Sequence, residues 1–153
     1  MSAIPSVDLR DFVSGDPERK AKFVREIGAA FESIGFVALS GHFLSDQLVE
    51  DLYEQIKQFF ALPQEVKDSY EIEGIGGQRG YTSFGKEHAK GRKEGDLKEF
   101  WHFGQYVENN PALEEEYPDN VMVSELADFN EVGKETYKML EKTAQYVLRA
   151  LAL

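Results

Sequence analysis

The 153-residue sequence contains no cysteine, which excludes disulfide bridges, thiolate metal sites and cysteine nucleophiles. It has no apolar run near the ~20 residues that a membrane-spanning helix needs. Its start, MSAIPSVDLRDF, lacks the basic flank and apolar stretch of a signal peptide. We therefore expect a cytoplasmic protein that is neither secreted through a signal peptide nor inserted into a membrane.

Positive charge is also scarce. The sequence has 17 Lys and Arg residues against 28 Asp and Glu residues, a formal net charge of -11. Such a charge repels nucleic-acid phosphates and anionic membrane surfaces, so we expect neither as a partner. With 42% hydrophobic and 12% aromatic residues, the composition is typical of a folded protein, and no linker is visible, so residues 1–153 are predicted to form a single domain.

Complete catalytic motifs are missing too. No GxSxG elbow occurs, and no Ser-His-carboxylate set can be selected. The glycine cluster GIGGQRG, residues 74–80, matches neither GxGxxG nor GxxxxGK followed by Ser or Thr, and therefore favours a turned loop over a phosphate-binding loop. None of the histidines at positions 42, 88 and 102 is followed two residues later by an acid, as a facial iron site would require. We predict no catalytic residue and no metal ligand in this chain.

Hydrophobic periodicity predicts a mixed order of helices and strands. An edge strand is expected over Ile4–Leu9, because proline at position 5 is tolerated at a sheet edge. Asp16 and Pro17 are typical of a helix start, and Gly35 of its end. The apolar run Phe36–Leu39 then indicates a buried strand, which gives a β-α-β opening.

The second part of the chain is predicted to hold three further helices and a long loop. One helix begins after Ser45, and a short helix follows over Gln64–Tyr70. The polar passage from Gly74 to Gly95 predicts a loop with an extended segment over Tyr81–Phe84, and Leu97–Phe103 predicts a strand. From Ser124 an apolar stripe predicts a long helix; it includes Phe129, Val132, Thr136, Leu140, Thr143, Val147 and Leu151.

Residues 78–104 concentrate aromatic and charged side chains without a helical stripe, so we predict that they border a ligand site. Arg79 can clamp a carboxylate through its planar guanidinium, and Tyr81 adds a hydroxyl beside an aromatic face; a surface arginine with a packed tyrosine remains the alternative. On the predicted strand, Phe100 and His102 share one face. For His102, a structural role and a ligand-facing role both stay open.

Five segments in the same order resemble the N-terminal region of the iron(II)/2-oxoglutarate-dependent oxygenases related to isopenicillin N synthase. They are IPSVDL, EIGAAFESIGFVALSGH, FFALPQEVKDSY, RGYTSFGKEHAKG and DLKEFWHFG. The resemblance covers nearly the whole chain and departs at Ser40-Gly41-His42, where relatives usually have Asn-His-Gly. It implies an α+β fold class: a helix-rich N-terminal region with a few short strands, which packs on a double-stranded β-helix (jelly-roll) core that this chain lacks.

The resemblance also implies a function. The full-length enzyme would use iron(II), 2-oxoglutarate and O2 to hydroxylate, desaturate or cyclise a small organic molecule. In the family, iron and 2-oxoglutarate are held in the jelly roll, so this chain alone is expected to be inactive and to bind neither cofactor, and its partner is the C-terminal jelly-roll portion of the same enzyme. The substrate-facing positions implied by the resemblance are Arg79, Tyr81, Phe84, Phe100 and His102.

Two alternatives stay open. The chain can be a stand-alone, non-catalytic binding or interaction module derived from that family, or a helical scaffold. The sequence following Leu153 separates the first alternative from the enzyme hypothesis, and substitution of Arg79 and Phe100 separates the second.

Overall fold

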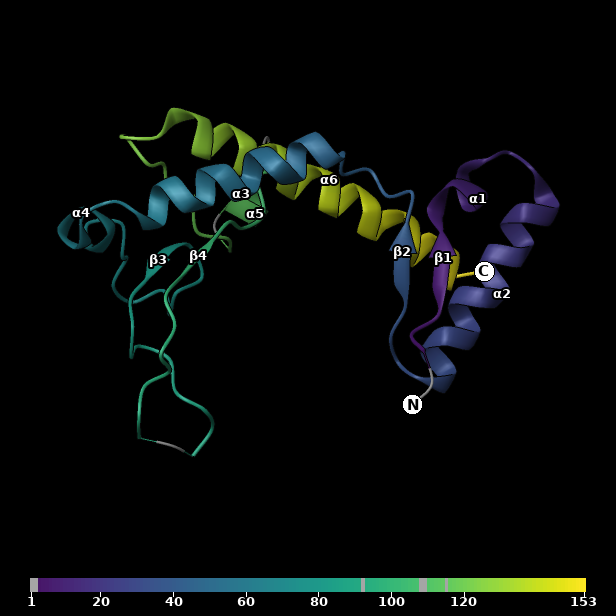
Figure 1. Cartoon of the computed structure of the whole chain (residues 1–153), viewed down its shortest axis with the longest axis horizontal. Coiled ribbons are helices and arrows are strands. Elements are labelled where there is room, and N and C mark those ends of the chain that lie inside the picture. Colours follow the sequence, from purple (N-terminus) through teal and green to yellow (C-terminus); the bar gives the residue numbers. More distant parts are fainter. Residues whose placement is uncertain (1–2, 92, 108–109, 115) are drawn as a thin grey trace. The chain divides into compact units, whose positions relative to one another are not determined.

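A computed structural model describes residues 3–91, 93–107, 110–114 and 116–153 (Figure 1). It divides into two compact units, Met1–Ser45 with Lys138–Leu153, and Asp46–Tyr137. The last helix, α6 (Ala127–Leu151), contributes residues to both units. Within the described residues, no helix is both long enough and apolar enough to cross a bilayer.

The first unit opens with a β-α-β arrangement. Strand β1 (Ser6–Asp8) leads through α1 (Leu9–Val13) and α2 (Pro17–Ser33) to β2 (Ala38–Ser40). The two strands pair in parallel, with Val7 opposite Leu39. The β-α-β order predicted from the sequence is therefore confirmed.

Local signals explain where α2 begins and ends. The Asp16 carboxylate accepts hydrogen bonds from the backbone N–H groups of Glu18 and Arg19, at 2.8 and 3.3 Å, and Pro17 occupies the first helical turn. These contacts satisfy donors that lack a partner inside the helix. At the other end Gly35 has φ +80°, the left-handed conformation that commonly follows a helix.

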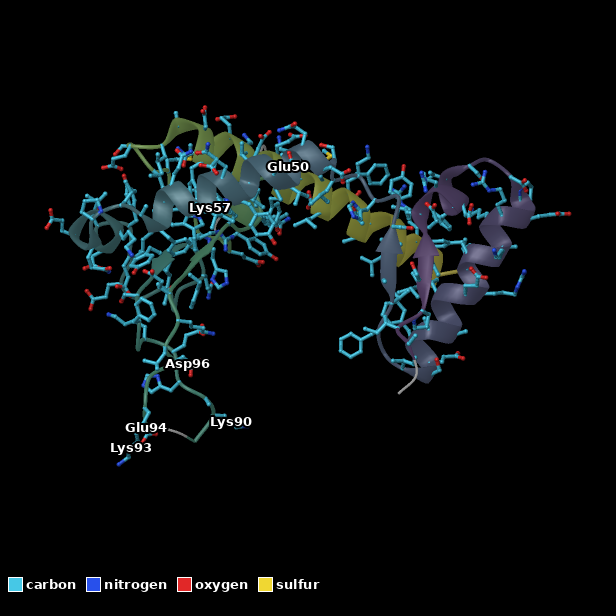
Figure 2. The ribbon with its side chains drawn as sticks, in the orientation of Figure 1. Glu50, Lys57, Lys90, Lys93, Glu94 and Asp96 are labelled. Atoms are coloured by element: carbon cyan, nitrogen blue, oxygen red, sulfur yellow. The ribbon has the colours of Figure 1, made fainter. Side chains whose placement is uncertain are left out.

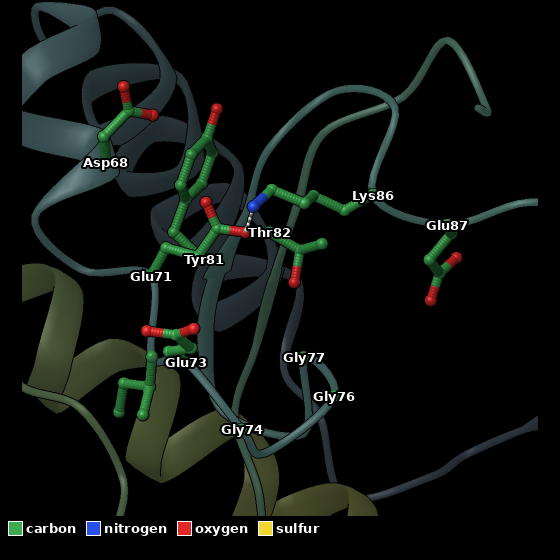
Figure 3. Close-up of a pocket in the computed structure, with 11 residues that line it drawn as sticks. Asp68, Glu71, Glu73, Gly74, Gly76, Gly77, Tyr81, Thr82, Lys86 and Glu87 are labelled. Carbon is green, nitrogen blue, oxygen red and sulfur yellow. Dashed lines mark ion pairs between the residues drawn. The ribbon is translucent and has the colours of Figure 1, made fainter.

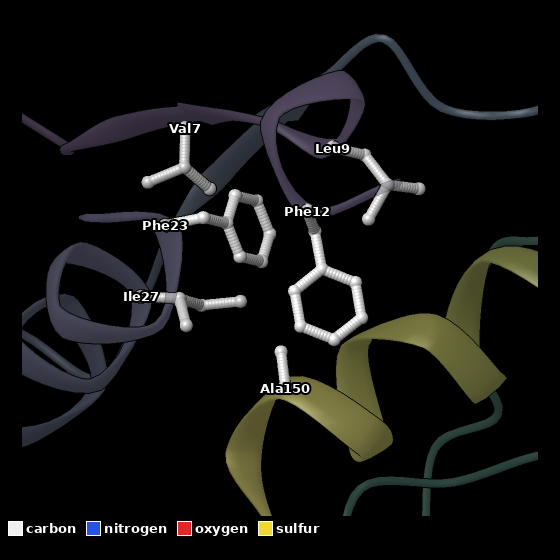
Figure 4. Packing of buried hydrophobic residues seen from close by; sticks show 6 residues of the cluster. All are labelled: Val7, Leu9, Phe12, Phe23, Ile27 and Ala150. Atoms are coloured by element: carbon white, nitrogen blue, oxygen red, sulfur yellow. The ribbon is translucent and has the colours of Figure 1, made fainter. Parts of the chain in front are cut away.

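The core of the first unit lies between α1, α2, β1 and the end of α6 (Figure 4). The rings of Phe12 and Phe23 lie 5.5 Å apart between centroids, and Tyr146 of α6 meets Phe12 edge-on at 6.4 Å. The buried members of this cluster are Val7, Leu9, Phe12, Phe23, Ile27 and Ala150.

Two predictions about this unit were wrong in detail. The expected strand Ile4–Leu9 is shorter, because the Asp8 side chain accepts from the N–H of Arg10 and caps α1 at Leu9. The run Phe36–Leu39 is not a buried strand: β2 covers Ala38–Ser40, and Phe36 is 67% exposed. The sheet has only two strands, so β2 has a strand partner along one edge only. The described residues therefore do not bury β2 as a central strand would be buried.

The second unit contains α3 (Asp46–Phe60), α4 (Gln64–Asp68), β3 (Gly80–Thr82), β4 (Phe100–His102) and α5 (Pro111–Glu114). Strands β3 and β4 pair antiparallel, with Tyr81 opposite Trp101. As predicted, α3 begins directly after Ser45 and α4 begins at Gln64. Helix α4 ends earlier than predicted, at Asp68, and Tyr70 packs against the core beyond it.

Aromatic rings dominate the core of this unit. Phe59 is fully buried, stacks on Phe129 with centroids 5.0 Å apart, and meets Trp101 edge-on at 4.7 Å. Tyr81 and Val123 complete the buried cluster. The core therefore joins α3, the β3–β4 hairpin and the start of α6.

The Asn130 side chain hydrogen-bonds to the segment that precedes α6. Its side chain is buried, accepts from the N–H of Val123 at 2.8 Å and donates to the carbonyl oxygens of Val123 at 2.8 Å and Leu126 at 3.3 Å. These bonds supply partners that buried backbone groups need.

Three predicted boundaries in the later part of the chain were wrong. The extended segment lies at Gly80–Thr82 rather than Tyr81–Phe84, and the strand Leu97–Phe103 is reduced to Phe100–His102 because the ladder has only three residue pairs. The long helix starts at Ala127 rather than Ser124. Its predicted stripe is buried at Phe129 and Thr136 but exposed at Leu140 and Leu151.

Candidate functional site

The β3–β4 hairpin separates two sets of side chains. Tyr81 and Trp101 lie opposite each other and belong to the aromatic core. Thr82 pairs with Phe100, whose ring lies 4.7 Å from that of His102. Because residues directly opposite in an antiparallel pair share a face, Thr82, Phe100 and His102 form the second face, which we call the outer face. The prediction that Phe100 and His102 share one side of a strand is confirmed.

A buried polar network lies on the core side of the hairpin. Glu99 Oε2 accepts from Lys67 Nζ at 2.8 Å and from the Tyr81 hydroxyl at 2.5 Å. Gln64 Nε2 donates to the Tyr81 hydroxyl oxygen at 3.1 Å. The Lys67 and Glu99 side chains are only 7% and 18% exposed. The network therefore links α4 to the residue before β4 through a largely buried ion pair, and to β3 through the Tyr81 hydroxyl.

Burial and this network shift two pKa values. Burial, together with the hydrogen bond to Glu99, raises the pKa of Tyr81 to about 12. Burial alone would raise the pKa of Glu99, but hydrogen bonds from Lys67 and Tyr81 and the Lys67 charge outweigh it, so the pKa of Glu99 is lowered. Tyr81 is thus held neutral and Glu99 ionised over a wide pH range.

The glycine-rich segment, residues 74–80, lies across the outer face of the hairpin. His102 Nδ1 lies 2.5 Å from the carbonyl oxygen of Gly77. A Cβ placed on Gly77 would lie 2.7 Å from Thr82 Oγ1 and 3.8 Å from Phe100 Cζ. Gly77 has φ +72°, which a residue with a side chain rarely adopts. The predicted turned loop is confirmed, and its close approach requires glycine.

A pocket of about 600 Å³ lies beside this loop (Figure 3). Lys86 reaches across it to Glu71, with Nζ 3.5 Å from Oε1. The Thr82 side chain stands between Lys86 and the glycine loop. The pocket is lined by Asp68, Glu71, Ile72, Glu73, Gly74, Gly76, Gly77, Tyr81, Thr82, Lys86 and Glu87.

Beyond the strands the hairpin continues into a loop of mixed charge. His88 forms an antiparallel β-bridge with Gly95. The side chains of Lys90, Lys93 and Glu94 lie toward the outer end of the loop, and Asp96 lies nearer the strands (Figure 2). His88 is exposed. This loop therefore presents both signs of charge rather than a basic or acidic patch.

The five predicted substrate-facing residues occupy different surroundings. Phe100 and His102 lie together on the outer face, Tyr81 lies in the core, and Phe84 is 55% exposed. Arg79 is 7% exposed and donates to the carbonyl oxygen of Gln78 at 2.7 Å; its guanidinium lies against Gly104. Their role toward a substrate stays a prediction.

Sequence reasoning missed Thr82, Gly77 and the Lys67–Glu99 pair. Thr82 shares the outer face only through its register with Phe100, which no local pattern encodes. The glycine cluster was recognised as a loop, but its packing on Thr82 depends on the hairpin.

The described residues do not fit an iron site. Among them, no three His, Cys, Asp or Glu side chains are grouped so that they could hold a metal ion. The Nδ1 atom of His102 is already engaged by Gly77.

The family model described as "non-haem dioxygenase in morphine synthesis N-terminal" matches residues 4–125. The chain belongs to this family. Among curated dioxygenase relatives, the 2-oxoglutarate-dependent dioxygenase frbA of Dothideomycetidae sp. is 31% identical over 80% of this chain and 38% of its own length. The 2-oxoglutarate-dependent dioxygenase imqE of Aspergillus flavus is 36% identical over 55% of this chain and 23% of its own length. The chain thus spans less than half of these relatives.

Solved dioxygenase-family structures share the fold. A putative 2OG-Fe(II) oxygenase family protein from Caulobacter crescentus matches with a TM-score of 0.83 and 36% identity, over 99% of this chain and 48% of its own. A full-length Neurospora crassa protein in complex with alpha-KG matches with a TM-score of 0.76 and 24% identity, over 97% of this chain and 42% of its own. The second likeness concerns the fold alone.

Proposed function

We propose that this chain is the N-terminal, substrate-pocket portion of an iron(II)/2-oxoglutarate-dependent oxygenase that hydroxylates, desaturates or cyclises a small organic molecule. The match of the dioxygenase N-terminal model over residues 4–125 carries the proposal. Relatives named 2-oxoglutarate-dependent dioxygenases support the cofactor assignment.

The described residues do not fit iron, so the role proposed for them is substrate orientation. Bound iron(II) with 2-oxoglutarate and O2 would supply the oxidising chemistry from outside these residues. Phe100 and His102 offer an aromatic surface and a ring nitrogen on the outer face, held rigid by the network behind it. Such a rigid wall restricts the orientation of a substrate.

Exposed apolar side chains support packing on a further portion of the same enzyme. Phe36, Leu140 and Leu148 are 67%, 52% and 65% exposed. Large exposed apolar groups often mark surfaces that another structure covers. We propose that the jelly-roll portion implied by the family covers these side chains.

Arg79 is largely buried, with an exposed fraction of 7%. Pairing with an anionic substrate group would require its guanidinium to leave Gly104 and the Gln78 carbonyl. Its buried Nε has no hydrogen-bond partner among the described residues, and a substrate carboxylate would provide one.

The test uses the gene product that includes whatever follows Leu153. A downstream His-x-Asp and 2-oxoglutarate consumption in the presence of iron(II) are expected. Phe100→Ala and His102→Ala should raise KM for the substrate about tenfold or more with iron affinity unchanged, whereas His88→Ala, in the exposed loop, should leave KM unchanged. A stop codon after Leu153 without turnover would favour the stand-alone module. Loss of iron binding with intact substrate affinity would contradict the orientation role.

A further inference from the structure

The pocket of Figure 3 carries an excess of negative charge. Four carboxylates and one ammonium line it, which gives a formal charge of -3. The ammonium, Lys86, is 61% exposed and lies 3.5 Å from Glu71. Exposed pairs at this distance contribute little, so an incoming cation can replace Lys86 beside Glu71.

Of the other pocket carboxylates, Glu87 is paired with Lys98 at 2.6 Å, whereas Asp68 and Glu73 are less neutralised than Glu71. Asp68 accepts from the neutral amide of Gln64 at 2.7 Å. Among the described residues, no cationic side chain pairs with Asp68 or Glu73. Acidic groups alone are common on solvated surfaces, so a ligand site needs independent evidence.

Thr82 provides that evidence. Its side chain is 4% exposed, lines the pocket, and its hydroxyl has no hydrogen-bond partner among the described residues. In Figure 3 the hydroxyl oxygen points toward the Gly76–Gly77 wall. Burying a hydroxyl without a hydrogen-bond partner is costly in free energy. A ligand that binds in the pocket and hydrogen-bonds to Thr82 would supply the missing partner.

Glycine at position 77 lets the loop pack directly on Thr82. A Cβ on Gly77 would lie 2.7 Å from Thr82 Oγ1, so a residue with a side chain would crowd the hydroxyl. A ligand N–H group that reaches Thr82 from the pocket could donate to this oxygen while its positive charge faces Glu71.

We propose that this pocket binds a small molecule through an ammonium or guanidinium group, with Glu71 as the charge partner and Thr82 as the hydrogen-bond acceptor. The volume, about 600 Å³, suits a small organic ligand. The net charge of -11 favours the approach of cations. The site goes beyond the proposed oxygenase function and does not depend on it.

Calorimetric titration of the 153-residue chain with agmatine tests the proposal, with 1,4-butanediol as the neutral control probe. Agmatine should bind and the diol should not. Glu71→Gln and Thr82→Val should each weaken agmatine binding about tenfold, because hydrogen bonds to charged groups are strong. Thr82→Val should not lower the urea midpoint, since it removes an unpaired buried hydroxyl.

Matched controls separate binding from folding. Thr136→Val removes another buried, unpaired hydroxyl, which lies on α6 outside the pocket lining, and Glu54→Gln removes an exposed carboxylate on α3; both should leave agmatine binding unchanged. No agmatine binding at about 1 mM, equal binding of the diol, or undiminished binding by Thr82→Val would overturn the proposal. In the full gene product, agmatine-stimulated 2-oxoglutarate consumption would identify the cation as substrate, and binding alone would identify it as a separate ligand.

Discussion

Lys67 and Glu99 are 32 residues apart in the sequence, yet Lys67 Nζ lies 2.8 Å from Glu99 Oε2 in a largely buried position. The same carboxylate oxygen accepts the Tyr81 hydroxyl. This contact holds α4 against the hairpin from the side opposite Phe100 and His102. Stability and the geometry of the outer face are therefore coupled.

Lys67→Met should destabilise the chain by about 3 kcal/mol, because it leaves the Glu99 carboxylate buried without its cation. Urea unfolding measures the change. The exposed pair of Lys57 with Glu54 provides the control (Figure 2 shows Lys57 on α3): Lys57→Met should change the free energy of unfolding by less than about 0.5 kcal/mol. The double variant Lys67→Met with Glu99→Gln should recover part of the lost free energy of unfolding, because the unpaired buried charge is removed. An equal loss in the double variant would contradict a buried-charge penalty.

Tyr81→Phe should alter how stability depends on pH in alkaline solution. The folded-state pKa of Tyr81 is raised from 10.0 to about 12, so its contribution is fully present below pH 10 and is lost as pH rises toward 12. The difference in unfolding free energy between wild type and Tyr81→Phe should be constant from pH 7 to 9 and shrink above pH 10. A constant difference up to pH 11.5 would show that the hydroxyl is not held neutral; Tyr53→Phe, at an exposed position, is the control.

Acid pH tests the carboxylate of the same network. The pKa of Glu99 is lowered in the folded chain, so its stabilising contribution is present above the unfolded value, near 4.5, and is lost as pH falls through the folded value. Glu99→Gln should therefore flatten the loss of stability below pH 4.5, measured by urea unfolding. An equally steep loss in this variant would assign the acid sensitivity to other carboxylates.

Gly80 and Gly15 form a matched pair for backbone strain. Both have positive φ, +73° and +79°. A Cβ on Gly80 would lie 2.6 Å from the Tyr70 carbonyl oxygen, while nothing lies within 4 Å at Gly15. Gly15→Ala should cost about 1 kcal/mol. Gly80→Ala should lower the free energy of unfolding by at least about 2 kcal/mol more than Gly15→Ala, because the hydrogen bond from the Tyr81 N–H to the Tyr70 carbonyl oxygen must also shift. Equal losses in thermal unfolding would contradict the close approach.

Asn130→Ala should lower stability by about 2 to 3 kcal/mol, since it leaves the N–H and carbonyl of Val123 without the side-chain partners that they have now. Gln58→Ala, on the exposed side of α3, should have little effect. Hydrogen exchange at the Val123 amide provides a local readout: protection should fall in Asn130→Ala and stay unchanged in the control.

Local signals in the sequence predicted α2 well. Its cap at Asp16, its proline at the first position and its terminal Gly35 all act within the helix or next to it. The apolar spacing placed Phe23 and Ile27 in the core correctly. Information that lies within a few residues can be extracted from one sequence.

The candidate site was less predictable because its contacts are long-range. The alternation that groups Phe100 with His102 is local and was predicted. The partner of that face, Thr82, depends on strand register, and the pairing of Lys67 with Glu99 depends on how α4 meets the hairpin. Leu140 shows the converse error: its spacing suits a buried helix face, but the described residues provide no cover for it.

The alternation along β4 has a consequence for engineering. Residues that stabilise the hairpin and residues of the outer face alternate along β4, so a combinatorial library at Phe100 and His102 can diversify the outer face while the Glu99 network stays unchanged. A single-residue insertion or deletion before Phe100 would instead exchange the two sets. Changes of specificity in this segment should therefore accumulate by substitution rather than by changes in length.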